Sequence, residues 1–506
     1  MKKILLFLTF SPILLTAQTA GDVVFATDQV VEVRITFNQV GYWDSLVANY
    51  STETDMIAAS MEFIDNTGSH VVDSINIRLK GNSSYGHPGN KKSFKVDFND
   101  YVAGQTYDGM KKLNFNNGFK DPTFMREKIF MDLCRSAGIP APRISFCNVY
   151  MNDVFWGFYT MVEQVDKEFI QNNFVDDTGN LFKAGDGFGS NPVFADLKDY
   201  GSLQSSYETR YELKTNEVVN DWTDLIEFIG FINTSTSTDF GNNLGININK
   251  TPYLRSVATD VLFANLDSYQ NSARNYYIYH DMLNDRWEWI KWDGNESFGS
   301  YTGGPGTGTM TSLAPNYIAA NRPLIQNTFN NSTLYSEYLL ELCWIMDQYF
   351  NNTYLDPKID AVKALIQPHV YADNLKQYTN TQFDQNTDVN ITVSGGMGSQ
   401  TIYGLKSFVT ARYNYLQGVV DCSLGTIDVE NTDLKVYPNP FSNSFTIKGV
   451  KETSEVKLID INGRQVDFDL TMVADEMNIS TSAMPGIYFV IIEDGESLKS
   501  IKLIKE

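Results

Sequence analysis

The chain has 506 residues, of which 42% are hydrophobic and 13% aromatic, so it is long enough for more than one core and too apolar to be disordered. Its formal net charge of −22 argues against sequence-independent binding to nucleic acids, because that binding needs a net basic surface. We therefore expect a folded, multidomain protein with no nucleic-acid partner.

The N-terminus has the plan of a secretory signal peptide. Two lysines precede an apolar stretch from Ile4 to about Leu15, and small residues follow up to Ala20. The stretch is shorter than the roughly 20 residues of a membrane-spanning helix, and Pro12 interrupts it. We predict that residues 1–20 are a signal peptide and that the mature chain has no membrane-spanning segment.

A large domain is expected over residues 21–424, and it opens with strands. The segments "VVEVRITF", "SINIRLKGNSS" and "KKSFKVDFN" alternate apolar and polar residues, and a loop rich in Gly, Asn and Ser joins the last two. Backbone N–H groups of such a loop can face an anion, and Lys91, Lys92 and Lys95 lie on the returning strand. The alternative is an ordinary turn, because most glycine-rich hairpins bind nothing.

A helix and two strands follow. In "DPTFMREKIFMDLCRSAGI", Asp121 is the expected N-cap and Pro122 the first helical residue, so this helix is expected mainly to pack. The next segment, "RISFCNVYMNDVFWGFYTMVEQVD", predicts two strands that turn at Asn152-Asp153. The second of them ends in Glu163 after a run of apolar residues.

The region from 251 to 299 carries the strongest group of candidate site residues. Thr251 and Pro252 begin a helix with Asp267 at its C-terminal end, where a carboxylate is best tolerated beside a cation or a hydrogen-bond donor. The segments "NYYIYHD" and "RWEWIKWD" predict a hairpin around "MLND", which would bring Asn275 and Asp293 toward Asp267. Carboxylate and amide oxygens suit Mg²⁺, which keeps waters and substrate phosphates in its shell. The sequence therefore indicates a site for a divalent cation and a nucleotide phosphate.

The cysteines and histidines indicate no structural metal. The four cysteines and four histidines lack the spacing of a zinc site. Disulfides are permitted in an exported protein, but a domain of this size does not depend on them.

After about residue 425 the composition changes to short alternating strands, which predict a small all-β sandwich over residues 435–506, joined by a linker at 425–434. The motifs "VYPNPF", "LIDINGR", "MPGIYFV" and the terminal "KSIKLIKE" resemble, in this order, the type A sorting domain of the type IX secretion system. The resemblance implies the type IX secretion machinery as a partner, and a protein that is secreted or held at the outer cell surface.

The large domain resembles the CotH family of spore-coat-type atypical protein kinases. The resemblance rests on "RLKGNSS", "KKSFKVDF", "MREKI", "VYMNDVFWGFYTMVEQVDKEFI", "GNLFK", "NLDSYQNSARNYYIYHD" and "WIKWDGNESFG", which occur in order. It implies an α+β protein, with a divergent protein-kinase-like domain followed by the small β-sandwich. It also implies transfer of the ATP γ-phosphate to Ser or Thr of secreted or cell-surface proteins.

The resemblance also assigns roles to single residues. Asp267 matches the acid that orients the hydroxyl nucleophile, and Asp293 matches the metal-binding acid, with Asn275 as a further metal ligand for Mg²⁺ or Mn²⁺. The positions expected to contact ATP are Lys92, Glu163 and Lys183.

One position departs from the family pattern. The family often has a second acid two residues after the metal-binding aspartate, where this chain has Asn295 followed by Glu296. The loss of one formal charge should weaken cation binding. Two alternatives to an active kinase therefore stay open, a CotH-like surface-binding or adhesion protein without catalysis and a carbohydrate-acting enzyme with paired acids.

Overall fold

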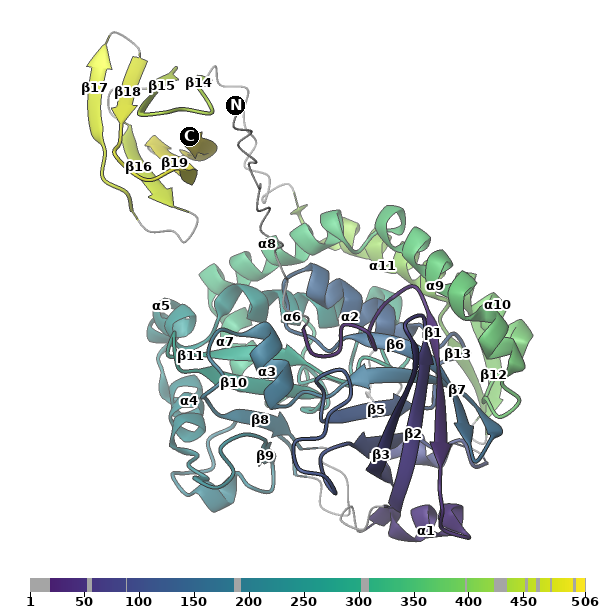
Figure 1. Ribbon diagram of the computed structural model, residues 1–506. Coiled ribbons are helices and arrows are strands. Elements are labelled where there is room, and N and C mark those ends of the chain that lie inside the picture. Colours follow the sequence, from purple (N-terminus) through teal and green to yellow (C-terminus); the bar gives the residue numbers. More distant parts are fainter. Residues whose placement is uncertain are drawn as a thin grey trace, which may run out of the picture. The chain divides into compact units, whose positions relative to one another are not determined.

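The computed structural model describes residues 19–505 except for a set of short segments: 52–56, 88, 186–192, 302–308, 396–397, 423–434, 451–453, 461–464, 474–475 and 495–496. The predicted signal peptide, up to residue 18, and the predicted linker at 425–434 lie outside the described residues. The chain divides into two compact units, residues 1–421 and 422–506. Helices and several sheets occur together, so the α+β prediction is confirmed (Figure 1).

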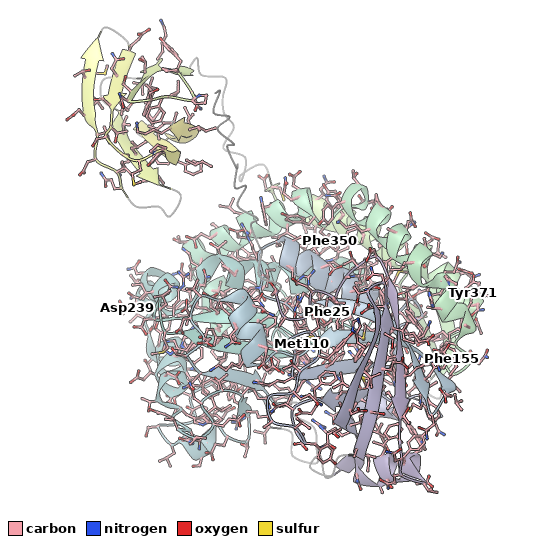
Figure 2. The ribbon with its side chains drawn as sticks, in the orientation of Figure 1. Phe25, Met110, Phe155, Asp239, Phe350 and Tyr371 are labelled. Atoms are coloured by element: carbon pink, nitrogen blue, oxygen red, sulfur yellow. The ribbon has the colours of Figure 1, made fainter. Side chains whose placement is uncertain are left out.

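The first unit contains a closed barrel in which strands follow the order β1-β2-β3-β4-β5-β7-β6. Neighbours are antiparallel except β1 and β6, whose parallel pairing closes the barrel. The barrel strands are β1 Val30–Thr36, β2 Ile57–Asp65, β3 Gly68–Leu79, β4 Phe94–Asp97, β5 Lys112–Asn116, β6 Ile144–Met151 and β7 Val154–Glu163. Apolar residues that alternate along these strands fill its core, among them Val33, Phe63, Ile77 and Phe94. Phe25 and Met110 also belong to this core, whereas Asp239 and Tyr371 lie at the periphery of the unit (Figure 2).

A second, four-stranded sheet lies beside the barrel in the order β11-β10-β8-β9 (Figure 1). Its strands are β8 Leu181–Ala184, β9 Tyr211–Leu213, β10 Tyr276–Asp281 and β11 Arg286–Lys291. The hairpin predicted around "MLND" is present, because β10 pairs with β11 from Tyr276 opposite Lys291 to Asp281 opposite Arg286. The hairpin predicted at Asn152-Asp153 is also present, and both of its turn residues have positive φ, 47° and 63°.

Helices cover both sheets. They are α1 Tyr42–Ala48, α2 Arg126–Ser136, α3 Lys167–Asn173, α4 Thr223–Thr234, α5 Ser237–Asn247, α6 Lys250–Leu262, α7 Pro323–Asn330, α8 Ser332–Gln348, α9 Asn352–Ala372, α10 Asn380–Asp388 and α11 Leu405–Val419. The green helices α8 to α11 run along one side of the unit, with α8 packed on α6 and α9 against β7 (Figure 1). A two-stranded sheet, β12 Ile391–Gly395 and β13 Gly398–Ile402, lies between α10 and α11 in the chain. In the described part of the chain, no helix combines the length and apolar character needed to cross a membrane.

Helix α2 begins later than the sequence predicts. The expected N-cap, Asp121, lies five residues before the first helical residue, because Phe124 has a left-handed φ of 58° that a helix cannot contain. Asp121 still acts on the helix start, since its Oδ2 accepts a hydrogen bond from the backbone N of Arg126 at 3.0 Å. The helix buries most of its residues, as expected for a packing element.

A buried ion pair ties the end of α9 to the barrel. Lys91 Nζ lies 2.5 Å from Asp373 Oδ2, and both side chains are fully buried. The same oxygen accepts the backbone N–H of Phe158 on β7 at 3.1 Å. A Cβ at Gly157 would lie 3.0 Å from this oxygen, so glycine permits the close approach.

We expect Asp373→Ala to destabilise the first unit by about 3 kcal/mol, because it leaves the Lys91 ammonium buried without its partner. Equilibrium urea unfolding would measure the change. Asp360→Ala is the matched control on the same helix, since Asp360 pairs with Lys406 at 2.6 Å but its side chain is 57% exposed. Equal effects of the two substitutions would contradict a structural role of the buried pair.

The second unit contains two antiparallel sheets on a shared core. One sheet has the order β14-β15-β18-β17 and the other β16-β19-β20. The strands are β14 Lys435–Tyr437, β15 Ser444–Lys448, β16 Glu455–Asp460, β17 Asp469–Val473, β18 Glu476–Ser480, β19 Gly486–Asp494 and β20 Ser497–Lys505. Phe445 and Ile479 from the first sheet are buried with Leu458 and Val490 from the second.

The cysteines fall into two classes. Cys343 and Cys422 are disulfide-bonded, whereas Cys134 on α2 and Cys147 on β6 are buried free thiols.

Candidate active site

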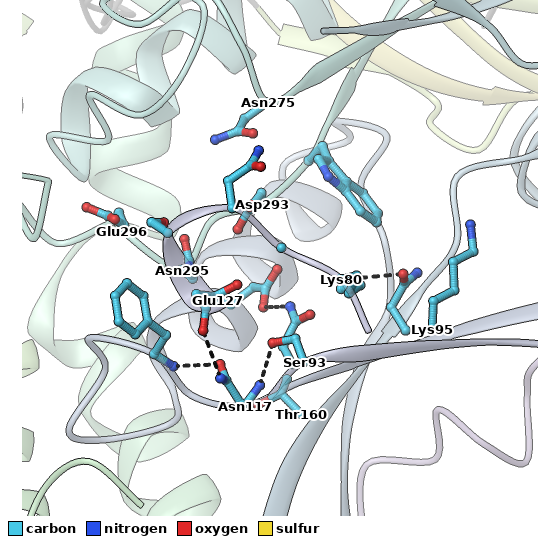
Figure 3. Close-up of a pocket in the computed structure, with 18 of the residues that line it drawn as sticks. Lys80, Ser93, Lys95, Asn117, Glu127, Thr160, Asn275, Asp293, Asn295 and Glu296 are labelled. Carbon is cyan, nitrogen blue, oxygen red and sulfur yellow. Dashed lines mark hydrogen bonds between the residues drawn. The ribbon is translucent and has the colours of Figure 1, made fainter. Parts of the chain in front are cut away.

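A cavity of about 440 Å³ lies between the barrel and the second sheet (Figure 3). It is lined from the barrel side by Lys80, Lys95, Asn114, Asn117 and Glu127, and from the other side by Lys183, Asp267, Asn275, Asp293, Asn295 and Glu296. The cavity therefore gathers carboxylates, amides and lysines from segments that lie far apart in the sequence.

Two features position Asp293 at the cavity, the hairpin of β10 and β11 and a tight packing contact of the next residue with α2. It follows the end of β11 by two residues and has a left-handed φ of 53°. A Cβ on the next residue, Gly294, would lie 2.4 Å from the Phe130 ring of α2, so a larger residue there would collide with the helix. The register of β10 with β11 places Asn275 and Asp293 at the same end of the hairpin, as predicted.

Asp267 lies in the loop after α6 and is held by its neighbours on both carboxylate oxygens. Ser272 Oγ donates to Oδ1 at 3.0 Å, and Asn275 Nδ2 donates to Oδ2 at 3.0 Å. Asn275 Nδ2 also donates to the Asp267 backbone oxygen at 2.7 Å. Arg274 Nε lies 3.7 Å from Oδ1, which supplies the cation that a carboxylate after a helix C-terminus requires.

Negative charge is crowded around Asp293. Burial raises the pKa of the Asp293 carboxyl well above its ordinary value, and the nearby carboxylates of Glu127 and Asp267 raise it further, while Lys80 opposes them. Burial also raises the pKa of Glu127 and of Glu296. Glu296 Oε1 accepts from Lys120 at 3.1 Å, but its buried Oε2 has no hydrogen-bond partner among the described residues. Additional positive charge at this end of the cavity would relieve the repulsion.

These residues fit a magnesium ion that is shared with a phosphate ligand. Within the described ranges, no three His, Cys, Asp or Glu side chains converge into a complete metal cage. Mg²⁺ usually takes only one or two carboxylates and fills its shell with waters and phosphate oxygens. Asn275 donates from its Nδ2 to Asp267, so its Oδ1 is the atom that would serve as an oxygen ligand, together with the Asp293 carboxylate in the same cavity.

Lysines line the rest of the cavity. Lys80 follows β3 and donates from Nζ to Asn114 Oδ1 at 3.0 Å. Burial lowers the pKa of Lys80 to about 8, although Asp293 and Glu127 oppose the shift. Burial lowers the pKa of Lys95 to about 7, and nearby cations, first Lys112, lower it further. An anionic ligand would stabilise the charged form of both side chains.

The structure brings together Asp267, Asp293, Asn275 and Lys183, but it does not bring Lys92 or Glu163 to the cavity. Lys92 Nζ instead donates to the backbone oxygens of Tyr85 and His87, both at 2.7 Å, and so closes the loop before it.

Glu163 points to the other face of β7, because side chains alternate along a strand. Its Oε1 lies 2.5 Å from Arg143 Nη2, so the Glu163 carboxylate forms an ion pair with Arg143 and does not face the cavity. The next residue, Gln164, lines the cavity.

Lys80 and Glu127 are among the cavity residues that were not predicted from the sequence. Lys80 lies directly before the glycine-rich loop, and Glu127 lies in the first turn of α2, where it is 5% exposed and accepts from Asn116 Nδ2 at 2.9 Å. An acidic residue on the buried face of a helix is the signal that could have identified Glu127.

Comparison with known families identifies two regions. Residues 77–416 match the family described as CotH kinase protein, and residues 435–506 match the secretion system C-terminal sorting domain. Inner spore coat protein H of Bacillus subtilis is 27% identical over 301 residues, which cover 59% of this chain and 79% of that protein.

Two fungal proteins are also similar. Invasin CotH3 of Rhizopus delemar is 23% identical over 405 residues, which cover 73% of this chain and 63% of that protein. Invasin CotH2 of the same organism is 22% identical over 393 residues, which cover 71% of this chain and 62% of that protein. The chain thus spans less than two thirds of the length of either invasin.

Proposed function

The chain belongs to the CotH kinase protein family, and on this premise we propose that it transfers the γ-phosphate of ATP to Ser or Thr hydroxyls of secreted or cell-surface proteins. The C-terminal sorting domain marks the chain for type IX secretion, so the protein is secreted or held at the cell surface. The observation that carries the proposal is the convergence of Asp267, Asn275, Asp293 and Lys80 on one cavity.

Asp267 is proposed to bind the acceptor hydroxyl and to take its proton. Its carboxylate is oriented by hydrogen bonds from Ser272 and Asn275, so an acceptor oxygen can approach an atom that is already fixed. The attack of that oxygen on the γ-phosphorus breaks the bond to the bridging oxygen, and the nucleoside diphosphate leaves.

Asp293 and the Oδ1 of Asn275 are proposed to hold the metal, Mg²⁺ or Mn²⁺, which when bound neutralises charge on the phosphates. Lys80 is proposed to contact the phosphates, with Lys183 beside it as the sequence suggests. Glu127 opposes the loss of the Lys80 proton and thereby helps to keep this side chain charged. In protein kinases the lysine that contacts the phosphates is likewise accompanied by a glutamate, with which it forms an ion pair.

The wild-type full-length protein should label a Ser/Thr-rich acceptor with the γ-phosphate of ATP, and the labelling should need Mg²⁺ or Mn²⁺. Phosphoamino-acid analysis of the labelled acceptor would identify the residue type. An absence of ATP binding in calorimetry with either metal would contradict the proposal.

A second candidate function is surface binding without catalysis. Two observations favour it, the similarity to proteins named invasins and Asn295 at the position where the family often has a second acid. Under this alternative the cavity would bind no ATP, so the same calorimetric experiment separates the two functions.

A further inference from the structure

The cavity extends beyond the groups that the proposed transfer uses. Lys80 lies between Asp293 and Lys95 in the view of Figure 3, and both of these residues are close enough to Lys80 to interact with it electrostatically. The region on the Lys95 side is lined by Arg78 at the end of β3, Lys95 on β4, Lys183 on β8 and Lys214 after β9. We call it the cationic end of the cavity.

Among the described residues, the lysines at the cationic end outnumber the carboxylates that form ion pairs with them. Glu212 pairs with Lys214. No carboxylate in the described part of the chain lies within ion-pairing distance of Lys95 or Lys183. The lysine ammonium groups thus share an enclosed space in a protein whose net charge is −22. A cluster of like charges destabilises a fold unless a ligand of opposite charge neutralises it. Its presence in a cavity therefore indicates a binding function.

The charged side chains of the cationic end suit a phosphate chain, and the rings of Tyr277 and Trp292 line the same cavity. This end presents Lys95, Lys214 and Glu212, with the amides of Gln164 and Asn114 beside them. Ammonium groups from separate elements match the several charged oxygens of a phosphate chain.

We propose that the cationic end is a second anion subsite that binds an oligophosphate chain through Lys95, Lys183 and Lys214. Lys183 is shared with the proposed ATP phosphate site, whereas Lys95 and Lys214 are not, and none of the three residues is assigned to the metal or to proton transfer. Two sources could supply the chain, a free oligophosphate or the triphosphate of a nucleotide bound in the reverse direction.

Calorimetric titration of the full-length protein with tripolyphosphate, without metal or nucleotide, tests the subsite. Lys95→Gln and Lys214→Gln should each weaken binding by about tenfold, because each removes one charged contact to phosphate. Lys92→Gln is the matched control, since Lys92 belongs to the same segment but its Nζ is bonded to backbone oxygens outside the cavity. Thermal unfolding of each variant would verify that it is folded.

Proton uptake provides a second readout. The charged groups around Lys95 are Arg78, Lys80, Lys112 and Lys214, with Asp166 and Glu212 as the acidic neighbours. With a Lys95 pKa of about 7, phosphate binding at pH 7 should draw a proton onto this side chain. Titrations in two buffers of different ionisation enthalpy should show more proton uptake in the wild type and in Lys92→Gln than in Lys95→Gln, because the protonation change of tripolyphosphate itself is common to all three proteins.

Absence of tripolyphosphate binding, or an unchanged affinity and proton uptake in Lys95→Gln, would overturn the subsite.

Transfer from ATP labelled at the α- or γ-phosphate separates the two sources of the chain. For a free chain, ATP and tripolyphosphate bind together and only γ-label is transferred. For a reversed nucleotide, the acceptor oxygen bonds to the α-phosphorus, its proton passes to Asp267, and the α–β bridging bond breaks, so α-label is transferred and pyrophosphate leaves. Either pattern supports the subsite, whereas a lack of γ-transfer contradicts the proposed kinase alone.

Discussion

Asp293→Asn is expected to weaken metal-dependent ATP binding by more than about a hundredfold, because it removes the carboxylate best placed to hold the metal against the phosphates. Calorimetry with ATP and MgCl₂ would measure the loss. Asn295→Asp is the matched control two residues away, and it should retain or strengthen the binding because it adds a carboxylate to the same cavity. Affinity within threefold of the wild type in Asp293→Asn would refute the assignment.

The same substitution should raise the melting temperature of the ligand-free protein. The pKa of Asp293 is raised by burial and by Glu127 and Asp267, so its ionised form is disfavoured in the fold. Stability is therefore lost as the pH rises above the ordinary aspartate pKa of about 4. The advantage of Asp293→Asn should be small at acidic pH and should grow toward neutral pH, as thermal unfolding at several pH values would show.

Asp267→Asn is expected to reduce phosphoryl transfer by about two to four orders of magnitude and to leave ATP binding within a few fold of the wild type. The reason is that Asp267 is proposed to act on the acceptor hydroxyl and not on the nucleotide. Single-turnover transfer of γ-label, together with calorimetry, would separate the two effects.

Ser272→Ala is the control for this prediction. It removes one of the hydrogen bonds that orient the Asp267 carboxylate and should cost far less activity than Asp267→Asn. If Asp267→Asn lost binding and transfer in equal measure, its role would be in nucleotide binding and the proposed chemistry would be incorrect.

The sequence predicted the features of this site that depend on local pattern. Alternating apolar residues ended by an acid predicted the hairpin that delivers Asp293, and turn residues suited to positive φ predicted the bend at Asn152-Asp153. Helical periodicity predicted the helix but placed Asp267 at its C-terminal end, whereas α6 ends at Leu262 and Asp267 lies five residues later in the following loop. Each of these inferences needs only the geometry of one strand pair or one helix.

Which lysine faces the cavity could not be predicted in the same way. Lys91, Lys92 and Lys95 are close in sequence, yet one pairs with Asp373, one closes a loop and one lines the cavity. The partner of Lys91 lies 282 residues further along the chain, so only the tertiary packing of α9 against the barrel fixes the direction of that side chain.

The absence of Glu163 from the cavity lining, where the sequence had predicted it, has a related physical reason. Neighbouring residues on a strand point to opposite faces, so an uncertainty of one residue exchanges a cavity residue for one on the opposite face of the strand. Here Gln164 faces the cavity, and Glu163 pairs with Arg143.

The burial of the two free thiols affects the disulfide of an exported chain. Burial raises the pKa of Cys134 to about 12 and that of Cys147 well above its ordinary value. Thiol–disulfide exchange proceeds through the thiolate, so both groups react extremely slowly once the first unit has folded. In the folded unit, the burial of Cys134 and Cys147 therefore protects the disulfide-bonded Cys343 and Cys422 from exchange with these free thiols in an oxidising compartment.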